Sequence, residues 1–308
     1  MQGSSTELGL RIRRFDGNSD LQLVADLIDV SSIKRRHRFD YPWRLSSSSA
    51  WSGQDAMLWH GVDDMLLGFA VWQQPWAVLD FYVRQTADQH EVEDAIFAWA
   101  ASRFRQLDAE RGKPLPYWAE AREDDPERLA LLARQGFGLD DDYAYVLLSR
   151  MLTGERNAQL PPSGFVVRPI AGLDEVKAYV ALHRRAFGSM SMTTEWRART
   201  LAMPHYSPEL DLVAVAPDGR LAGFCVCWPN FDQRVGQIEP LGVDPDFQGS
   251  GLGRALLNEI CHRLERLGAT EALVETETTR SPARQLYESN GFRAKDVSLR
   301  KGRWMRDS

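Results

Sequence analysis

A repeat at a constant offset of 155 residues is the strongest constraint that this sequence places on its fold. Similar residues recur at that offset in four separate places along the chain. The pairs are Ile12-Arg13 with Val167-Arg168, Gly68-Phe69 with Gly223-Phe224, Glu120 with Glu275, and Gly136-Phe137 with Gly291-Phe292. A single match arises easily by chance, but a fixed offset across four places indicates that the chain holds two copies of one fold.

The boundary between the copies falls at residues 153–164, TGERNAQLPPSG, which is polar and contains the Pro-Pro pair typical of linkers. We therefore expect a first domain at 1–152 and a second at 165–308. Each copy begins with a short strand, continues with helices and a strand hairpin, and then alternates strands with helices. This order predicts a layered α/β (α+β) domain with a mixed sheet in each copy.

The composition is that of an ordinary globular protein, with 44% hydrophobic and 26% charged residues. The formal net charge of −6 argues against nucleic acid as a partner. No apolar run of about 18 residues predicts a membrane span, and the polar start MQGSSTEL lacks the apolar core of a signal peptide. Three cysteines suit a reducing compartment, so we expect a cytoplasmic protein. Cys225 and Cys227 share one face of a predicted strand and are interpreted as small buried apolar residues.

Three glycines occur in the stretch VDPDFQGSGLGRALL of the second copy, residues 243–257. Before them, QIEPLGV at 237–243 predicts a strand interrupted by a proline and a glycine. After them, apolar residues at helical spacing predict a helix over 252–267, which Gly268 ends. The glycines therefore precede a helix N-terminus, where free N–H groups bind anions and a missing Cβ lets phosphate approach. A tight turn is the alternative, but one glycine would satisfy it.

The spacing of these glycines excludes two common phosphate-binding motifs. A Walker loop requires GxxxxGK[ST] and a dinucleotide fingerprint requires GxGxxG, and neither is present. The motif that fits is Gln-x-x-Gly-x-Gly, formed by Gln248, Gly251 and Gly253, with Val-x-Pro before it and ARQLYESNGF at 283–292 downstream. With these motifs, residues 165–300 resemble the GCN5-related N-acetyltransferase (GNAT) superfamily. The first copy shares the resemblance only through the repeat.

The resemblance implies two tandem GNAT-fold domains, each with a mixed, mostly antiparallel sheet flanked by helices. It implies acetyl-CoA as the cosubstrate and no metal. The loop amides would bind the pyrophosphate, and the preceding strand would pair with the pantetheine arm. The corresponding cofactor-binding residues are Leu241, Gly242, Val243, Gln248, Gly249, Ser250, Gly251, Leu252, Gly253 and Arg254.

The resemblance also implies two catalytic residues. Tyr287 stands where the family places a tyrosine near the sulfur, and we predict that it protonates the leaving thiolate. Glu239, in the strand before the loop, is the predicted base or amine anchor, acting directly or through water. Packing on a helix is the alternative role for Tyr287, and a structural role is the alternative for Glu239. One departure is Arg280, which stands where the family often has an asparagine that contacts the coenzyme.

The resemblance places the acceptor pocket among the first helices and the strand hairpin of the second copy. Each candidate residue there is also a reasonable core residue, and His183 is in addition an alternative base. The candidates are His183, Phe187, Trp196, Trp228 and Asn230.

The first copy has no glycine between Gly68 and Gly112, so it cannot hold a Gly-x-Gly loop. The corresponding stretch carries Glu91, Glu93 and Asp94, which would repel a pyrophosphate. We therefore predict a degenerate domain that has lost coenzyme binding of the usual kind. Seven of the ten tryptophans lie in this copy and predict a large aromatic core, with a wall or lid for the acceptor site as the alternative.

We therefore predict an acetyl-CoA-dependent N-acetyltransferase whose second domain transfers acetyl to the primary amine of a small molecule. Two alternatives stay open: a non-catalytic acyl-CoA-binding or sensing protein, and a transferase that uses another acyl donor. Neither the identity of the amine nor the oligomeric state follows from the sequence.

Overall fold

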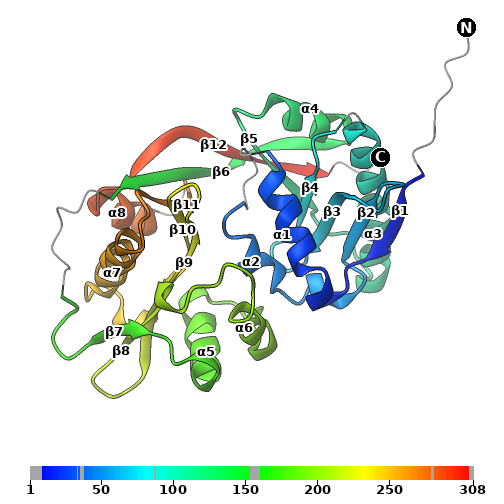
Figure 1. Ribbon diagram of the computed structural model, residues 1–308. Helices are drawn as coiled ribbons and strands as arrows, with labels where there is room; N and C mark the ends of the chain where they lie inside the picture. The colour runs from blue at the N-terminus through cyan, green and yellow to red at the C-terminus, as the bar shows by residue number, and fades with distance from the viewer. Residues whose placement is uncertain are drawn as a thin grey trace, which may run out of the picture. The chain divides into compact units, whose positions relative to one another are not determined.

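The computed structural model describes residues 9–32, 34, 38–86, 88–152, 160–278 and 281–304. Within these ranges it describes every side chain except those of 139–144, 281 and 296–301. Residues 153–159 of the predicted linker, the polar start at 1–8, and Arg280 lie outside the described residues. The chain forms two compact units, both drawn in Figure 1.

Neither unit is one continuous stretch of sequence. Unit 1 comprises residues 1–38, 47–142 and 300–308, and unit 2 comprises residues 39–46 and 143–299. A short segment of the first copy, 39–46, therefore belongs to unit 2, and the segment that follows residue 299 belongs to unit 1. The division of the two copies at 153–164 stays a prediction.

Unit 1 contains a sheet with the strand order β1-β2-β3-β4-β5-β12-β6. Neighbouring strands are antiparallel from β1 to β4, whereas β4 and β5 are parallel. The strands are β1 (Arg11–Arg14), β2 (Ala56–His60), β3 (Leu66–Gln73), β4 (Val78–Val83), β5 (Trp118–Arg122), and parts of β6 (Phe137–Met151) and β12 (Arg293–Trp304). The helices are η1 (Gly17–Ser19), α1 (Leu21–Val30), η2 (Ala50–Ser52), α3 (Gln89–Arg111) and α4 (Pro126–Arg134).

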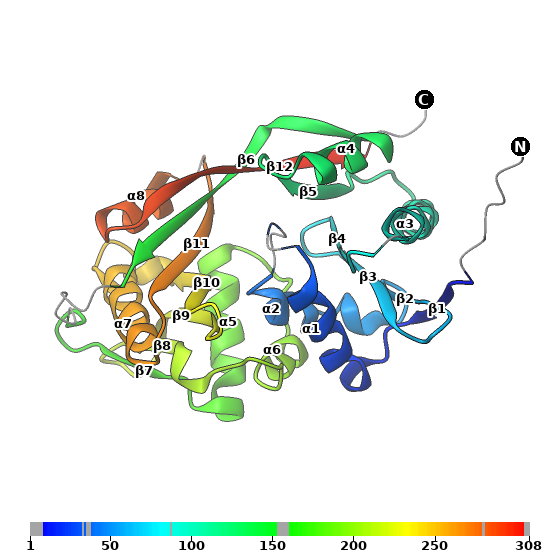
Figure 2. The same cartoon turned by 45° about the horizontal axis from the view of Figure 1, so that its top comes forward.

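Unit 2 has the matching order β7-β8-β9-β10-β11-β6-β12. Its first four strands are antiparallel neighbours, and β10 and β11 are parallel. Figure 2 shows β11 beside β6, which pairs with it in antiparallel register. Besides β6 and β12, the strands are β7 (Val166–Pro169), β8 (Asp211–Val215), β9 (Leu221–Asn230), β10 (Val235–Val243) and β11 (Glu271–Glu277). The helices are α2 (Tyr41–Leu45), η3 (Gly172–Glu175), α5 (Val176–Phe187), α6 (Thr194–Thr200), η4 (Pro208–Leu210), η5 (Pro245–Phe247), α7 (Leu252–Arg266) and α8 (Ser281–Ser289).

The two units repeat the same elements at the offset seen in the sequence. Strands β1, β2 and β3 correspond to β7, β8 and β9, and helix α4 corresponds to α8, because each partner begins 155 residues later. The connection before the long helix differs: residues 84–88 join β4 to α3, whereas the longer segment 244–251 joins β10 to α7. The described residues of unit 1 therefore include no counterpart of the glycine loop.

The core of unit 1 is aromatic. Trp59 and Trp72 are almost completely buried, and the ring of Trp72 packs edge-on against Phe104 and Tyr117, with centroids 5.0 and 4.9 Å apart. Trp59 and Trp72 are therefore core residues, as the number of tryptophans in the first copy predicts.

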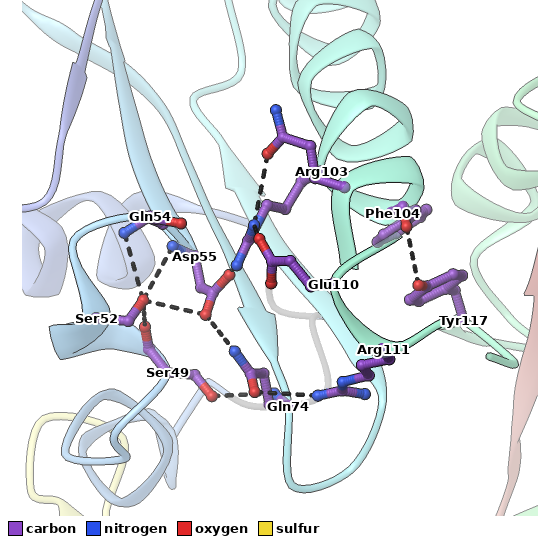
Figure 3. Close-up of polar contacts among 11 residues, drawn as sticks. Ser49, Ser52, Gln54, Asp55, Gln74, Arg103, Phe104, Glu110, Arg111 and Tyr117 are labelled. Carbon is purple, nitrogen blue, oxygen red and sulfur yellow. Dashed lines mark hydrogen bonds and ion pairs between the residues drawn. The ribbon is translucent and has the colours of Figure 1, made fainter. Parts of the chain in front are cut away.

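A buried ion pair fixes α3 of unit 1 to the start of β2 (Figure 3). Asp55 is fully buried and accepts hydrogen bonds from Arg103 Nε at 2.7 Å, Gln74 Nε2 at 2.5 Å and Ser52 Oγ at 3.0 Å. These donors satisfy the buried carboxylate, so the cluster has a structural role.

The two faces of the unit 2 sheet pack against different helices. Phe224 of β9 packs with Tyr179 and Leu182 of α5, whereas Cys225 and Cys227 pack with the apolar residues of α7. This alternation follows from the period of two in a strand. All three cysteines are buried and unbridged, as small apolar core residues are. In the part of the chain that the structure describes, no helix has the length and apolar content needed to cross a membrane.

Candidate active site

Strand β10 separates from its neighbour β11 halfway along its length. Its parallel pairing with β11 covers only Val235–Gln237. Its register with β9 shifts between Ile238 and Leu241, so that Glu239 and Pro240 form a β-bulge. Beyond the bulge, the β11 side of β10 has main-chain groups without a strand partner among the described residues. Such an edge can pair with an extended ligand.

The glycines of the loop have two different physical roles. Gly249 and Gly251 have positive φ angles of 75° and 92°, which a residue with a side chain rarely adopts. Gly253 has an ordinary φ, but a Cβ on it would lie 3.3 Å from Leu286 of α8. The first two glycines therefore set the turn, and the third allows α8 to approach the first turn of α7.

The N-terminus of α7 is open. Gly251 is its N-cap residue and supplies no side-chain hydrogen bond. In the described part of the chain, the amides from Gly249 to Arg254 have no hydrogen-bond acceptor. Arg254 is exposed in the first turn. Free amides, a helix dipole and a guanidinium together form a site suited to an anion such as a diphosphate.

An ion pair anchors the start of the loop. Asp244, which is 4% exposed, accepts two hydrogen bonds from Arg185 of α5, at 2.7 and 2.9 Å, and one from the amide of Asp246 at 3.0 Å. The Arg185 guanidinium is the main cause that lowers the pKa of Asp244. Gln248 and Ser250 are exposed and donate side-chain hydrogen bonds to carbonyls within the same turn. The loop is therefore built from its own contacts and from α5.

Glu239 lies in the bulge and is half-buried. Its main-chain carbonyl accepts a hydrogen bond from Trp228 Nε1 at 2.7 Å. Burial is the main cause that raises the pKa of Tyr179, and the negative charge of Glu239 adds to the rise. The same charge also adds to the rise in the pKa of the Cys225 thiol, whose main cause is burial.

Tyr287 lies on α8 and is 7% exposed. Its ring packs edge-on against Phe292, with centroids 5.8 Å apart, and belongs to the core that α7 lines. The preceding residue, Leu286, is the one that touches Gly253. Tyr287 is thus a packed helix residue, on a helix that contacts the glycine loop.

The structure brings together three of the five acceptor candidates. His183 lies between Phe187, with ring centroids 4.7 Å apart, and Phe224, against which it stacks at 5.5 Å. Trp43 links His183 to Trp196, with centroids 5.9 and 4.9 Å away. These rings form an aromatic wall on the α5 face of the sheet.

The other two candidates lie on β9. Trp228 is fully buried and holds the bulge, as described above. Asn230 ends the strand, and its Oδ1 accepts a hydrogen bond from the amide of Gln233 at 2.9 Å in the hairpin turn. It is four residues beyond Val226, the position opposite the bulge, which corresponds to roughly 13 Å along a strand.

The electrostatic environment of His183 disfavours a role as base. The side chain is 6% exposed, and burial, with a smaller contribution from Arg197, lowers its pKa to about 4. The imidazole is therefore neutral near pH 7 and too weakly basic to remove a proton from an ammonium group efficiently. Between the two predicted bases, this favours Glu239.

A buried polar network beside this wall gives no signal in the sequence. Arg197 of α6 forms an ion pair with Asp211 of β8, and both side chains are fully buried. Tyr206 also donates a hydrogen bond to Asp211, at 2.7 Å, and the Arg197 guanidinium lies 3.7 Å from the ring centroid of Tyr179. Arg197 and Asp211 are 14 residues apart in the sequence, and no known motif has this spacing. The sequence alone therefore could not have predicted that they form a buried ion pair.

A mixed, mostly antiparallel sheet, a bulged central strand and a glycine loop at a helix N-terminus define an N-acetyltransferase type of fold. The profile of the Acetyltransferase (GNAT) family matches residues 176–292. With the relatives described next, this shows that the chain belongs to the GNAT family and is an N-acetyltransferase.

Curated relatives cover much of the chain. A mycothiol acetyltransferase from Geodermatophilus obscurus is 35% identical over 217 residues, which cover 66% of this chain and 68% of the relative. A mycothiol acetyltransferase from Clavibacter sepedonicus is 32% identical over 265 residues and covers 81% of each chain.

One similar solved structure has the same tandem layout. It is described as a tandem GNAT protein from the clavulanic acid biosynthesis pathway. The TM-score is 0.61 at 14% identity, over 97% of this chain and 100% of that chain. Likeness at this identity shows the fold alone, and it confirms the prediction of two tandem GNAT-fold domains.

Proposed function

We propose that unit 2 transfers the acetyl group of acetyl-CoA directly to the primary amine of a small molecule. The observation that carries the proposal is the sequence of two features along the chain: the unpaired edge of β10 is followed, after the loop 244–251, by the open N-terminus of α7. The first suits an extended pantetheine arm and the second suits a pyrophosphate. The cofactor-binding residues are then Leu241 to Val243 and Gln248 to Arg254.

In this proposal the amine nitrogen attacks the thioester carbonyl carbon, and the C–S bond breaks as the amide bond forms. Glu239 accepts the proton of the amine, directly or through water, and the Tyr287 hydroxyl protonates the leaving sulfur. A main-chain amide in 241–243 stabilises the oxyanion. Both side chains belong to unit 2, which supports a catalytic second copy.

The first copy has a different role in this proposal. The short connection at 84–88 leaves no room for a glycine loop, and Glu93, near the start of α3, is a buried carboxylate that accepts a hydrogen bond from Gln89 at 2.8 Å. Negative charge at that place opposes a pyrophosphate. The three buried, unbridged cysteines support a reducing compartment such as the cytoplasm.

The acceptor is proposed from the curated relatives. Because several are named mycothiol acetyltransferase, the unacetylated, free-amine form of mycothiol is the first acceptor to test. No metal is part of the proposal, and among the described residues no group of three or more His, Cys, Asp or Glu side chains is placed to hold one.

The experiment is a thiol-release assay with acetyl-CoA and a panel of amines that includes this compound, sugar amines and amino acids. We expect turnover with at least one small amine, and none with Gly251→Glu, which places a carboxylate in the anion site. Binding of acetyl-CoA without turnover of any amine would instead support a sensing protein. Full activity of Gly251→Glu would refute the assignment of catalysis to unit 2.

A further inference from the structure

A segment of the first copy is built into the unit that carries the candidate active site. Residues 39–46, which contain α2, belong to unit 2 although unit 1 supplies the sequence on both sides of them. Trp43 is 3% exposed, and Ser46 is fully buried. These two side chains are therefore part of the interior of unit 2.

The segment holds one side of α6 through specific contacts. The rings of Trp43 and Trp196 stack at 4.9 Å with an interplanar angle of 30°. Trp196 Nε1 donates a hydrogen bond to Ser46 Oγ at 3.0 Å, and that hydroxyl also lies 2.9 Å from Thr200 Oγ1. Arg199 Nε donates to the carbonyl of Ser46 at 2.9 Å. Two turns of α6 are thus tied to a segment that is distant in sequence.

The next residue of α6, Arg197, forms the buried ion pair with Asp211 of β8. Trp196 and Arg197 are neighbours in sequence, so α6 cannot turn without breaking both sets of contacts. The position of the helix is therefore set jointly by the first copy and by β8.

Trp43 also reaches the aromatic wall of the acceptor side. Its ring centroid is 5.9 Å from that of His183. His183 Nδ1 is buried and has no hydrogen-bond partner among the described residues. A buried polar atom in this state is costly unless a water or a ligand supplies a partner. The aromatic wall therefore contains a polar atom, His183 Nδ1, that could accept or donate a hydrogen bond, and its ring lies beside Trp43.

We propose that Trp43 and Ser46 are positioning residues that set the affinity and selectivity of the enzyme for its amine. They do so by fixing the positions of α6 and of the His183 ring. They do not affect the binding of acetyl-CoA, because the glycine loop is held by Arg185 and by α8 and not by the segment 39–46. This inference rests on the proposed function of unit 2.

The test compares the KM of each substrate in Trp43→Ala, Trp43→Phe and Ser46→Ala, using the amine of the panel with the highest turnover. We expect the KM of the amine to rise about tenfold in Trp43→Ala, equivalent to about 1.4 kcal/mol. Ser46→Ala should show a smaller rise, and Trp43→Phe should retain most of the affinity because it keeps a stacking ring. The KM of acetyl-CoA should stay within twofold of wild type.

The control is Trp51→Ala, which removes an indole that packs on Phe15 in unit 1 and should leave both KM values unchanged. A merely structural role predicts equal rises in both KM values, and that result would overturn the inference. An unchanged KM of the amine in Trp43→Ala and Ser46→Ala would also overturn it. If Trp43→Ala does not fold, Trp43→Phe and Ser46→Ala decide the outcome. Absence of turnover by the wild type would refute the proposed function together with the inference, whereas wild-type turnover with no selective KM change refutes only the inference.

Discussion

The indole Nε1 of Trp228 donates a hydrogen bond to the main-chain carbonyl of Glu239, with 2.7 Å between nitrogen and oxygen. This bond joins β9 to the bulge of β10 and fixes the peptide group that carries the proposed base. The placement of Glu239 thus depends on the hairpin of the sheet, whereas the anion site depends on the loop and α7. Substitutions can therefore separate the chemical step from coenzyme binding.

Glu239→Gln should lower kcat about 100-fold or more, because the amide cannot accept the proton of the amine. The KM of acetyl-CoA should change little, since Glu239 lies outside the loop. Steady-state kinetics in both substrates checks this, with Glu265→Gln on α7 as the matched control. A kcat within threefold of wild type would assign Glu239 a structural role.

Gly251→Ala should weaken acetyl-CoA binding more than tenfold, because φ at this position is 92° and the turn would have to change to accept a side chain. Gly219→Ala is the matched control, since Gly219 has φ of 84° in the β8–β9 turn, away from the loop. Both variants should lose about 1 kcal/mol or more of stability. Calorimetric titration should show weakened binding only for Gly251→Ala. Equal affinities would contradict the loop assignment.

Asp244→Asn should make the loop less stable and raise the Kd of acetyl-CoA a few-fold. Since the Arg185 guanidinium lowers the folded-state pKa of Asp244, its contribution is present above the unfolded pKa of about 3.9 and is lost as pH falls through the lower, folded pKa. Unfolding curves at acidic pH should therefore fall less steeply for the variant. Asp218→Asn is the control, because Asp218 pairs with Arg220 and the side chains of both residues are exposed to solvent. Similar effects of the two substitutions would rule out a special role for the Asp244 anchor.

His183 should make the folded protein less stable in mild acid. Its pKa is about 4 when folded and about 6.5 when unfolded, so its contribution is complete above pH 6.5 and falls as pH drops toward 4. Wild type should lose on the order of 3 kcal/mol more than His183→Gln between pH 7 and pH 4. Denaturant unfolding at a series of pH values measures the difference. Parallel curves for the two proteins would show that the imidazole is not held neutral.

Local patterns in the sequence predicted the central elements of unit 2 closely. The strand predicted at 237–243 is β10, Val235–Val243, and the helix predicted at 252–267 is α7, Leu252–Arg266. Periodicity and glycine placement determine these elements over short distances, so they can be recognised in a single sequence. The two roles of the loop glycines needed coordinates, because the contact of Gly253 with Leu286 joins two helices.

The acceptor side was much less predictable. Trp43 stacks on Trp196, which is 153 residues away in the sequence, and Arg197 pairs with Asp211 through packing of α6 on the sheet. Asn230 looked like a pocket residue, but its side chain caps a hairpin turn. Contacts of this kind depend on tertiary packing, and they leave no pattern of neighbouring residues that could be recognised in a sequence.

Each copy contributes a segment to the other unit: residues 39–46 belong to unit 2, and residues 300–308 belong to unit 1. The chain therefore cannot be cut into its two units at a single point. A break at the linker would separate β11 from the strand β6, with which it pairs from Glu271 to Glu277, and would leave an open sheet edge prone to self-association. The same break would take from unit 1 the strand end at Trp304, whose amide donates to the carbonyl of Tyr117 at 2.9 Å. A cut at the linker would therefore remove backbone hydrogen bonds from both units, so the two halves of the sequence are expected to be less stable apart than joined.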